Sequence, residues 1–252
     1  MPRHLLLVLE GPLLAFGGEV VDARGVVGDF PTASLLIGLL ANALGWRRGE
    51  RERHARLQAR LVFAARIDRE GERITDFQTA QLGKDDRGWT TSGTPEERAG
   101  GPGTYAAPHI RLRDYDADKR VTVALRLDPA GEAPDLEALA AALESPARPL
   151  FLGRKTCLPS RPLLGGLVEA EGLLAALASL PPEPAVGLWR ILLPATEPTL
   201  LGDERRWAGD LRDWHSGVHG GGRTVLIRHL APPRPDAASD DRGQAAEAGT
   251  CP

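Results

Sequence analysis

Four short apolar segments and two helical patterns organise the first 170 residues. Residues 4–9 are almost continuously apolar until Glu10, which predicts a buried strand. Residues 61–67 and 121–127 predict a second and a third strand, the third with alternating apolar positions, and residues 163–170 can supply a fourth. Residues 11–29, rich in glycine and valine, are predicted to form a loop.

The clearest helix begins after Thr32, whose hydroxyl can accept from the free N–H groups of a first helical turn. Its apolar face would comprise Leu35, Leu36, Leu39, Leu40 and Ala43, and Gly45 is a suitable C-terminal stop. A second helix is predicted at residues 136–143, before Pro146. The arginine-rich residues 47–60 predict a solvated turn or a short helix.

The resulting order is strand, helix, strand, strand, helix, strand. This order predicts an α+β fold with a ferredoxin-like (RRM-like) domain over residues 1–170. Residues 76–118, between the second and third strands, are too long for a hairpin loop. Their flanks, 75–82 and 105–115, are predicted to pair as a long β-hairpin thumb with a polar, glycine-rich tip.

The last third of the chain predicts less structure. Apolar strands at residues 187–193 and 224–230 predict a small β region over residues 171–230. From residue 231 onward Pro, Ala, Asp and Gly dominate without periodicity, so residues 231–252 are expected to form a disordered tail.

Composition limits the class of protein. Of 252 residues, 42% are hydrophobic and 26% charged, which is typical of a globular chain. No stretch approaches the roughly 20 apolar residues of a membrane span, and the N-terminus does not resemble a signal peptide. The two cysteines, Cys157 and Cys251, indicate a reducing cytoplasm rather than a disulfide framework.

The formal charge of −3 argues weakly against RNA binding, because RNA-binding domains are often basic. Removing the charged side chains of residues 231–252 leaves 29 basic and 30 acidic residues, a balance of −1. Any RNA-binding surface must therefore be a local patch, and partners would be needed to build a continuous groove.

Three segments are candidates for such a patch. The helix start, with Gly28, Thr32 and Ser34, could bind a phosphate, although plain capping is the commoner explanation for such a motif. The second candidate is residues 151–157, after the second predicted helix. Gly153 allows the backbone to approach a phosphate closely, but a solvated loop explains this segment equally well. The basic residues from 148 to 169 are Arg148, Arg154, Lys155 and Arg161, against Glu169 alone.

The third candidate is the base of the thumb. Its polar and aromatic residues are Gln78, Thr79, Arg111, Arg113 and Tyr115. An arm of this kind can wedge between bases or pack against a neighbouring subunit, and the alternative is a disordered insertion.

Catalytic and metal-binding motifs are not evident. His215 and His219 have the i, i+4 spacing of a helical metal site, but four glycines surround them and no acidic or thiol ligand cluster accompanies them. A surface loop is therefore favoured, and no metal or other cofactor is expected. The sequence contains no nucleophile elbow, P-loop or paired-carboxylate signature.

The order of several short motifs carries a family resemblance. They are LEGPLLAFG at residues 9–17, FPTAS at 30–34, GLLANALG at 38–45, DFQT at 76–79, RDY at 113–115 and PLFLGRKTC at 149–157. Together they resemble the CasD family, the Cas5-type RNA-binding (RAMP) subunits of type I-E CRISPR Cascade complexes. The resemblance covers roughly residues 4–230.

The resemblance implies both a fold and a role. The fold would be a ferredoxin-like domain with a β-hairpin thumb, a glycine-rich loop and a small C-terminal β region. Members of the family cap the 5′ handle of the guide RNA (crRNA), and they contact the backbone subunit CasC and the large subunit CasA. By position, Thr32, Ser34 and residues 153–155 would lie along the handle, and the thumb would press against the guide.

Two other functions remain open. A metal-independent endoribonuclease that processes precursor CRISPR RNA could draw on Tyr105, His109, Tyr115 and Lys155, which no close spacing unites. A separate subunit performs this cut in type I-E systems, so the resemblance favours binding without catalysis. The other alternative is a protein-only scaffold, for which changes at Arg154 and Lys155 would leave RNA affinity unchanged.

Overall fold

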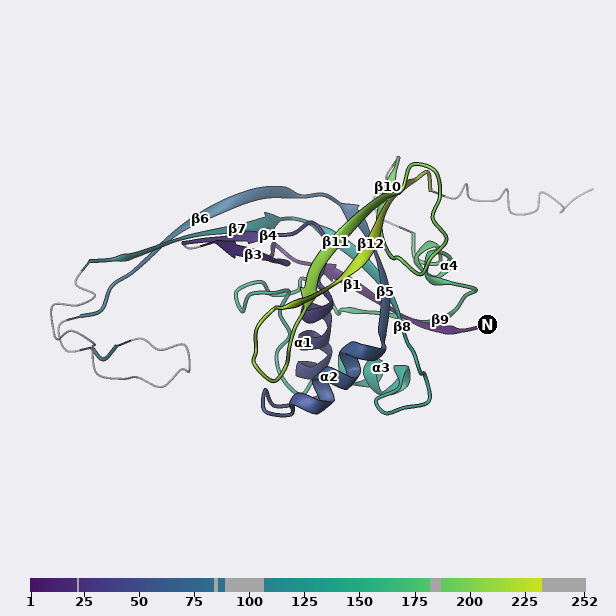
Figure 1. The fold of residues 1–252 in the computed structure, drawn as a ribbon, viewed down its shortest axis with the longest axis horizontal. Coiled ribbons are helices and arrows are strands. Elements are labelled where there is room, and N and C mark those ends of the chain that lie inside the picture. The colour runs from purple at the N-terminus through teal and green to yellow at the C-terminus, as the bar shows by residue number, and fades with distance from the viewer. Residues whose placement is uncertain (22, 84–85, 89–106, 182–186, 233–252) are drawn as a thin grey trace, which may run out of the picture.

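Seven strands form a large sheet, every neighbouring pair of which is antiparallel. The computed structural model describes residues 1–21, 23–83, 86–88, 107–181 and 187–232. The strands of this sheet are β1 (Arg3–Glu10), β5 (Leu61–Arg69), β8 (Arg120–Leu127), β9 (Leu164–Glu169), β10 (Trp189–Pro194), β11 (Glu204–Leu211) and β12 (Gly221–Leu230). Their spatial order is β11-β12-β10-β5-β8-β1-β9 (Figure 1).

Helices cover both faces of this sheet. The helices are α1 (Ala33–Ala43), α2 (Arg51–Arg60), α3 (Leu136–Glu144) and α4 (Leu173–Ala178). The first three lie on one face, where Leu5 and Leu7 of β1 join their core, and α4 lies on the other face with Leu6 (Figure 1). Because successive side chains of a strand alternate between faces, burial on both sides explains why β1 is continuously apolar.

A second sheet carries the projecting part of the molecule. Its strands are β2 (Leu13–Leu14), β3 (Gly17–Val21), β4 (Arg24–Val27), β6 (Glu72–Ala80) and β7 (His109–Ala117). Strands β6 and β7 pair antiparallel, from Glu72 opposite Ala117 to Ala80 opposite His109, and we call this hairpin the arm (Figure 1). Strands β2 and β4 pair with β7, and β3 pairs with β4.

Most of the predicted elements are confirmed. The six predicted strands of the large sheet are present as β1, β5, β8, β9, β10 and β12, and the two predicted helices are α1 and α3. Thr32 caps α1 by accepting from the backbone N–H of Leu35 at 3.1 Å, and Gly45 follows its C-terminus with a φ of +78°. The paired flanks of residues 76–118 also confirm the predicted hairpin.

Two predictions of local structure need correction. Residues 11–29 contain β2, β3 and β4, which pair with one another or with the arm and give no periodic signal of their own. Residues 47–60 contain a short helix, which was one of the two predicted alternatives, but this helix is less solvated than expected because α2 buries His54, Leu57 and Arg60. The guanidinium of Arg60 donates to three backbone carbonyls, which satisfies its charge inside the protein.

The C-terminal strands extend the large sheet. β10 pairs with β5 and β12, so residues 171–230 add β10, β11 and β12 to the sheet of the first 170 residues. The sequence did not predict β11 or the short helix α4. The tip of the thumb at residues 89–106 and the tail from residue 233 lie outside the described residues.

Candidate RNA-binding cleft

A cleft of about 420 Å³ lies where α1, the second sheet, the loop after α3 and the loop after β11 meet. Apolar walls come from Phe16, Leu35, Leu39 and Phe151, among others. Its polar or charged side chains are Thr32, Ser34, Asn42, Arg113, Arg154, Arg212 and His219. None of the described residues that line it is acidic, so the cleft favours a negatively charged ligand.

The N-terminus of α1 forms one wall, and two N–H groups of its first turn are engaged by side chains. Asp210 accepts from the N–H of Ala33 at 3.0 Å, and Thr32 accepts from that of Leu35. The Thr32 and Ser34 hydroxyls, 3.2 Å apart, line the cleft. This geometry agrees with the capping explanation of the motif, and the two hydroxyls are polar groups that a ligand in the cleft could contact.

Glycines allow the second sheet to approach the loop after α3. Gly153 has a φ of +101°, and a Cβ there would lie 1.9 Å from the carbonyl oxygen of Ala15. Ala15 in turn donates its N–H to Leu152 at 3.1 Å. Gly28 donates to Phe16 at 3.0 Å and packs beside the carbonyl of Gly17, behind the cleft wall. These contacts hold the two segments together.

Arg154 is half-buried and fixes this loop to the second sheet. Its guanidinium donates to the carbonyl oxygens of Asp114 at 2.7 Å and Gly25 at 2.9 Å. It also stacks on the ring of Tyr115, 4.6 Å from the ring centroid, and leaves that ring 4% exposed. Arg154 therefore positions the loop, whereas the neighbouring Lys155 is exposed and has no ion-pair partner among the described residues.

The other arginines of the expected basic patch at residues 148–161 also make contacts within the fold. Arg148 donates to the carbonyl oxygens of Gly45 and Trp46, just past the C-terminus of α1. Arg161 lies 3.6 Å from a carboxylate oxygen of Glu10. The fold therefore uses both cations, and Lys155 is the exposed cation of this segment. Sequence proximity did not indicate which carbonyls and carboxylates these side chains would reach.

The arm carries a polar hollow that continues from the cleft. Gln78, Thr79, Ala80, His109, Arg111 and Arg113 line this hollow of about 570 Å³. Arg113 also lines the cleft, and it donates to the side-chain oxygen of Gln78 at 2.9 Å. Because Gln78 lies opposite Arg111 in the hairpin, both side chains project from the same face.

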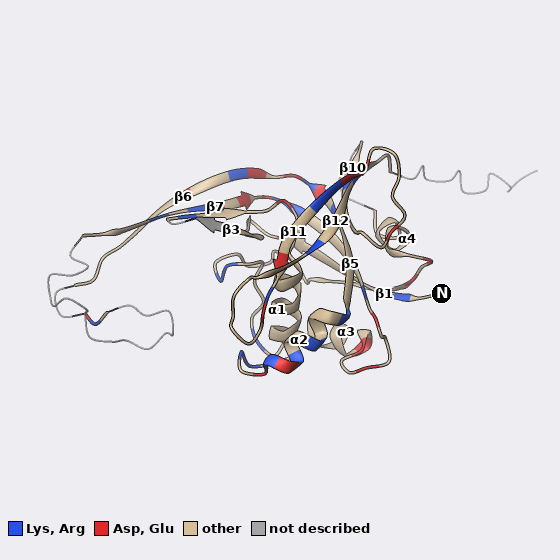
Figure 2. Ribbon diagram, viewed as in Figure 1, with Lys and Arg blue, Asp and Glu red and all other residues tan. Residues whose placement is uncertain are grey.

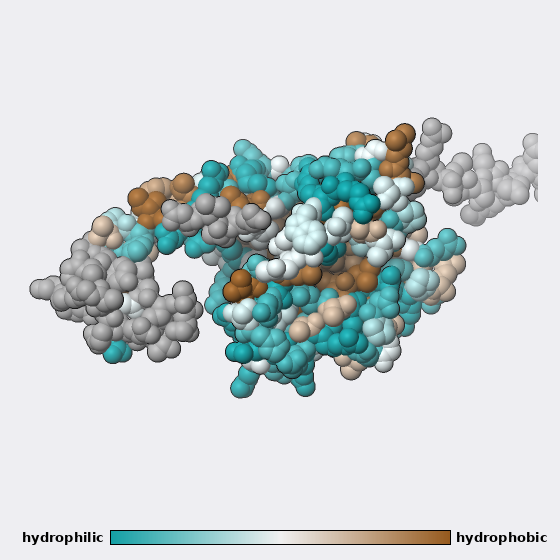
Figure 3. Space-filling view, viewed as in Figure 1, coloured by the Kyte–Doolittle hydropathy of each residue, from teal (hydrophilic) through white to brown (hydrophobic). Residues whose placement is uncertain are grey.

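The other face of the arm is more apolar. Phe77 lies opposite Leu112, and Thr79 lies opposite Ile110. Phe77 is 62% exposed, and apolar side chains are visible on the arm in Figure 3. In the outer half of the arm, one face therefore offers charge and the other offers apolar surface.

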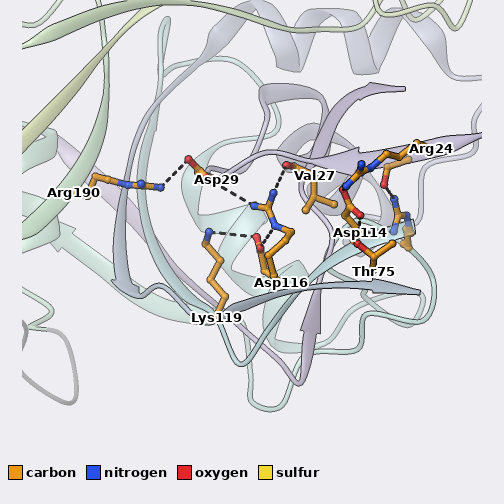
Figure 4. A network of polar contacts seen from close by, with 11 residues as sticks. Arg24, Val27, Asp29, Thr75, Asp114, Asp116, Lys119 and Arg190 are labelled. Atoms are coloured by element: carbon orange, nitrogen blue, oxygen red, sulfur yellow. Dashed lines mark hydrogen bonds and ion pairs between the residues drawn. The ribbon is translucent and has the colours of Figure 1, made fainter. Parts of the chain in front are cut away.

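A network of ion pairs holds the base of the arm against the body (Figure 4). Arg73 of β6 donates to Asp116 at 2.7 Å and lies 3.4 Å from Asp29, which also pairs with Arg190 of β10. Beside it, Asp114 accepts from Thr75 at 2.7 Å and lies 3.3 Å from a guanidinium nitrogen of Arg24. The Thr75 hydrogen bond, followed by Arg24, lowers the pKa of Asp114 and keeps it ionised.

The sequence did not indicate the third wall of the cleft. Arg212, Trp214 and His219 line it from the loop after β11. Gln58 of α2 holds this loop: its amide donates to the carbonyl of Arg212 at 3.0 Å, and its oxygen accepts from the backbone N–H of Arg212 and the indole N–H of Trp214. The only sequence signal in this loop is the nearby occurrence of Arg212, Trp214 and His215, which does not indicate what the loop contacts.

No metal site is apparent in the described part of the chain. His215 and His219 belong to no group of three or more potential ligands there, and His215 lies 3.3 Å from Glu52. Burial, and then the nearby Arg212, lower the pKa of His219. The helices of the described residues include none long and apolar enough to cross a bilayer.

Known proteins are similar to this chain in sequence and in fold. The family model described as CRISPR-associated protein (Cas_Cas5) matches residues 4–226. The Escherichia coli (strain K12) protein named CRISPR system Cascade subunit CasD is 31% identical over 185 residues, which are 72% of this chain and 79% of that protein.

Two solved structures have similar folds. A chain of a structure titled CRISPR RNA-guided surveillance complex has a TM-score of 0.64 and 26% identity, covering 91% of this chain and 90% of that one. A chain of a structure titled Crystal structure of Cas protein has a TM-score of 0.58 and 29% identity, covering 91% of this chain and 95% of that one. This chain belongs to the Cas5 family of CRISPR-associated proteins.

Proposed function

We propose that this chain is a non-catalytic, cytoplasmic subunit of a CRISPR RNA-guided Cascade complex and that it binds and caps the 5′ handle of the guide RNA. The observation that carries the proposal is the continuity between the cleft and the arm, because Arg113 lines both. A single RNA strand could follow this surface, with its phosphates toward Arg111, Arg113 and Lys155. The E. coli relative, a Cascade subunit, supports the same role.

The arm supports the further proposal that the chain bridges the backbone subunit CasC and the large subunit CasA. Its exposed apolar residues, Phe77 and Ile110, occupy the face opposite the charged one. Apolar side chains exposed together are typical of protein interfaces. The arm could thus hold RNA on one face and a neighbouring subunit on the other.

The arrangement supports a non-catalytic role better than the alternative endoribonuclease. His109 and Tyr115 lie six residues apart on β7, about 20 Å along an extended strand. That separation does not let them act on one phosphodiester. Tyr115 is also covered by Arg154. Tyr105 lies outside the described residues.

We also propose that β1, α1, β5, β8, α3 and β9 form a ferredoxin-like unit. Within the large sheet these strands occur in the order β9-β1-β8-β5. β8 thus separates β1 from β5, which is the arrangement of a split βαβ motif. The arm is an insertion between β5 and β8, and the C-terminal strands extend the sheet beyond β5.

The test is co-expression of the chain with the other type I-E subunits and a CRISPR array. The complex would be purified with the wild-type chain, with Arg111→Ala/Lys155→Ala, or with Arg205→Ala. Arg205 is an exposed control on β11 that does not line the cleft. The 5′ ends of the retained RNA would be sequenced in each case.

The expected result is a defined 5′ handle with the wild type and the control. The double variant should lose handle protection while precursor processing continues. If processing instead stops whenever this chain is omitted, the chain is a nuclease and the capping role is wrong. If all three complexes protect the same handle, these residues do not bind it.

A further inference from the structure

Two arginines approach each other at the edge of the cleft without a carboxylate between them. Arg212 follows β11, and Arg48 precedes α2. A Cβ placed on Gly217 would lie 3.3 Å from a terminal guanidinium nitrogen of Arg212 and 3.5 Å from one of Arg48. Gly217 has a φ of +79° and lacks a side chain, so both guanidinium groups lie beside its backbone.

Neither guanidinium has an ion-pair partner among the described residues, unlike many arginines of this chain. The Nε of Arg212 is buried and makes no hydrogen bond within the described structure. The nearest acidic side chain in sequence, Asp213, accepts instead from Ser216 and the N–H of His215. Burial, followed by Arg48, lowers the pKa of Arg212, as expected for two like charges brought together.

Neighbouring residues fix the position of Arg212. Gln58 makes hydrogen bonds with both backbone polar groups of Arg212. The Arg212 guanidinium lies 5.2 Å from the centroid of the Trp214 ring, which stacks on His54 at 4.6 Å. The position of Arg212 is therefore preorganised, and an anion that reaches it would find its guanidinium without an acidic partner among the described residues.

We propose that Arg48 and Arg212 form a phosphate-binding subsite that holds one phosphodiester of the bound RNA at the rim of the cleft. This inference rests on the proposed RNA-binding function and adds a contact point on the wall opposite the loop of Gly153. Guanidinium groups match phosphate oxygens in geometry, and two of them can share one phosphate through charged hydrogen bonds. The cleft then holds a strand between the arm side, at Arg113, and the α2 side, at Arg212.

The experiment uses the full-length chain and single-stranded RNAs that carry the handle sequence. In each RNA, one phosphate is replaced by a neutral methylphosphonate, and affinities are measured for every position at several salt concentrations. The variants are Arg212→Gln and Arg48→Gln, and Arg205→Gln is the control. Because Arg48 is exposed, its replacement tests the subsite even if Arg212→Gln weakens the fold.

The wild type should bind about tenfold more weakly when the methylphosphonate replaces one particular phosphate, because one charged contact is then lost. Each arginine variant should bind unmodified RNA about tenfold more weakly and lose the sensitivity at that position. The salt slope should fall by about 0.7 when the contact with that phosphate is lost. The Arg205 control should retain the wild-type pattern.

Three results would overturn the inference in different ways. If the wild type binds RNA but the arginine variants keep its full methylphosphonate pattern, the subsite is wrong and the proposed function stands. If the wild type does not bind handle RNA, both the subsite and the proposed RNA-binding function are wrong. Weaker assembly of the variants with protein subunits, with unchanged RNA affinity, would assign the arginines to a protein carboxylate instead.

Discussion

Replacing Arg154 should destabilise the fold, because this side chain holds the loop of residues 151–157 on the second sheet. Arg154→Ala removes two charged hydrogen bonds, to the carbonyls of Asp114 and Gly25, and a stacking contact with Tyr115. Hydrogen bonds to charged groups contribute about 1.5–3 kcal/mol each, and a partly exposed cation–π contact contributes about 0.5–1 kcal/mol. Since Arg154 is only half-buried, we expect the lower end of this range.

The free energy of unfolding should therefore fall by about 3 kcal/mol in Arg154→Ala. For a chain of this size such a loss lowers Tm by about 6–12 °C. Urea denaturation of the full-length chain, followed by tryptophan fluorescence, measures the change. Arg154→Lys should recover about half of it, because an ammonium reaches one carbonyl but lacks the planar fork for two.

Lys155→Ala is the matched control. Its side chain is exposed and one residue away, so its removal should change the free energy of unfolding by less than about 0.5 kcal/mol. Equal stability of the Arg154→Ala and Lys155→Ala variants would refute the reasoning. In that case Arg154 would be available for RNA, and the loop would be held by its backbone alone.

Three further changes test other parts of the structure. Gly153→Ala should cost more stability than Gly166→Ala, because both residues have positive φ but only Gly153 faces a carbonyl, and thermal unfolding of both variants measures the difference. Gln58→Ala should lower the free energy of unfolding by about 1–3 kcal/mol through lost hydrogen bonds to the loop after β11, with Gln58→Glu intermediate in urea titrations. His4 is fully buried, and burial followed by Arg126 lowers its pKa below the ordinary 6.5. Because the unfolded chain then binds more protons, the wild type should lose stability as pH falls below about 6.5, and His4→Leu should lose less in denaturation measured from pH 7.5 to 5.

Each of these three predictions has a result that contradicts it. Equal costs of the two glycine changes would show that the Ala15 carbonyl moves away freely. A Gln58→Ala variant as stable as the wild type would mean that the 212–214 segment is held by other contacts. Parallel pH profiles of the wild type and His4→Leu would show that His4 titrates alike in the folded and unfolded chains.

Charge is distributed unevenly among the elements that build the cleft. Figure 2 shows α1 without charged side chains, whereas α2 carries both signs. The apolar α1 is fixed in the core between the large sheet and the cleft, where Thr32 and Ser34 are its polar contribution. The charges that a ligand can reach come from the arm and from loops, which agrees with a near-neutral chain that binds RNA locally.

Local patterns in the sequence determined the elements that are regular and well buried. The apolar run of β1, the alternation of β8 and the capped helix α1 each follow from a few neighbouring residues. The arm was predictable because a 43-residue polar interruption, residues 76–118, cannot close a tight hairpin. Half of the candidate site also followed from motifs, as Thr32, Ser34, Arg113 and Arg154 all line the cleft.

Only the tertiary structure decided which cations are free and which are used by the fold. Nothing in the sequence distinguishes Arg148 and Arg154 from Arg48 and Arg212. In the structure, however, Arg148 and Arg154 donate to backbone carbonyls. Arg48 and Arg212 are separated by more than 160 residues and meet because Gln58 fixes the loop after β11 on α2. A charged side chain reaches whatever acceptor the folded chain brings near it. Contacts of such long sequence separation leave no local periodicity, so the pattern of residues alone could not reveal them.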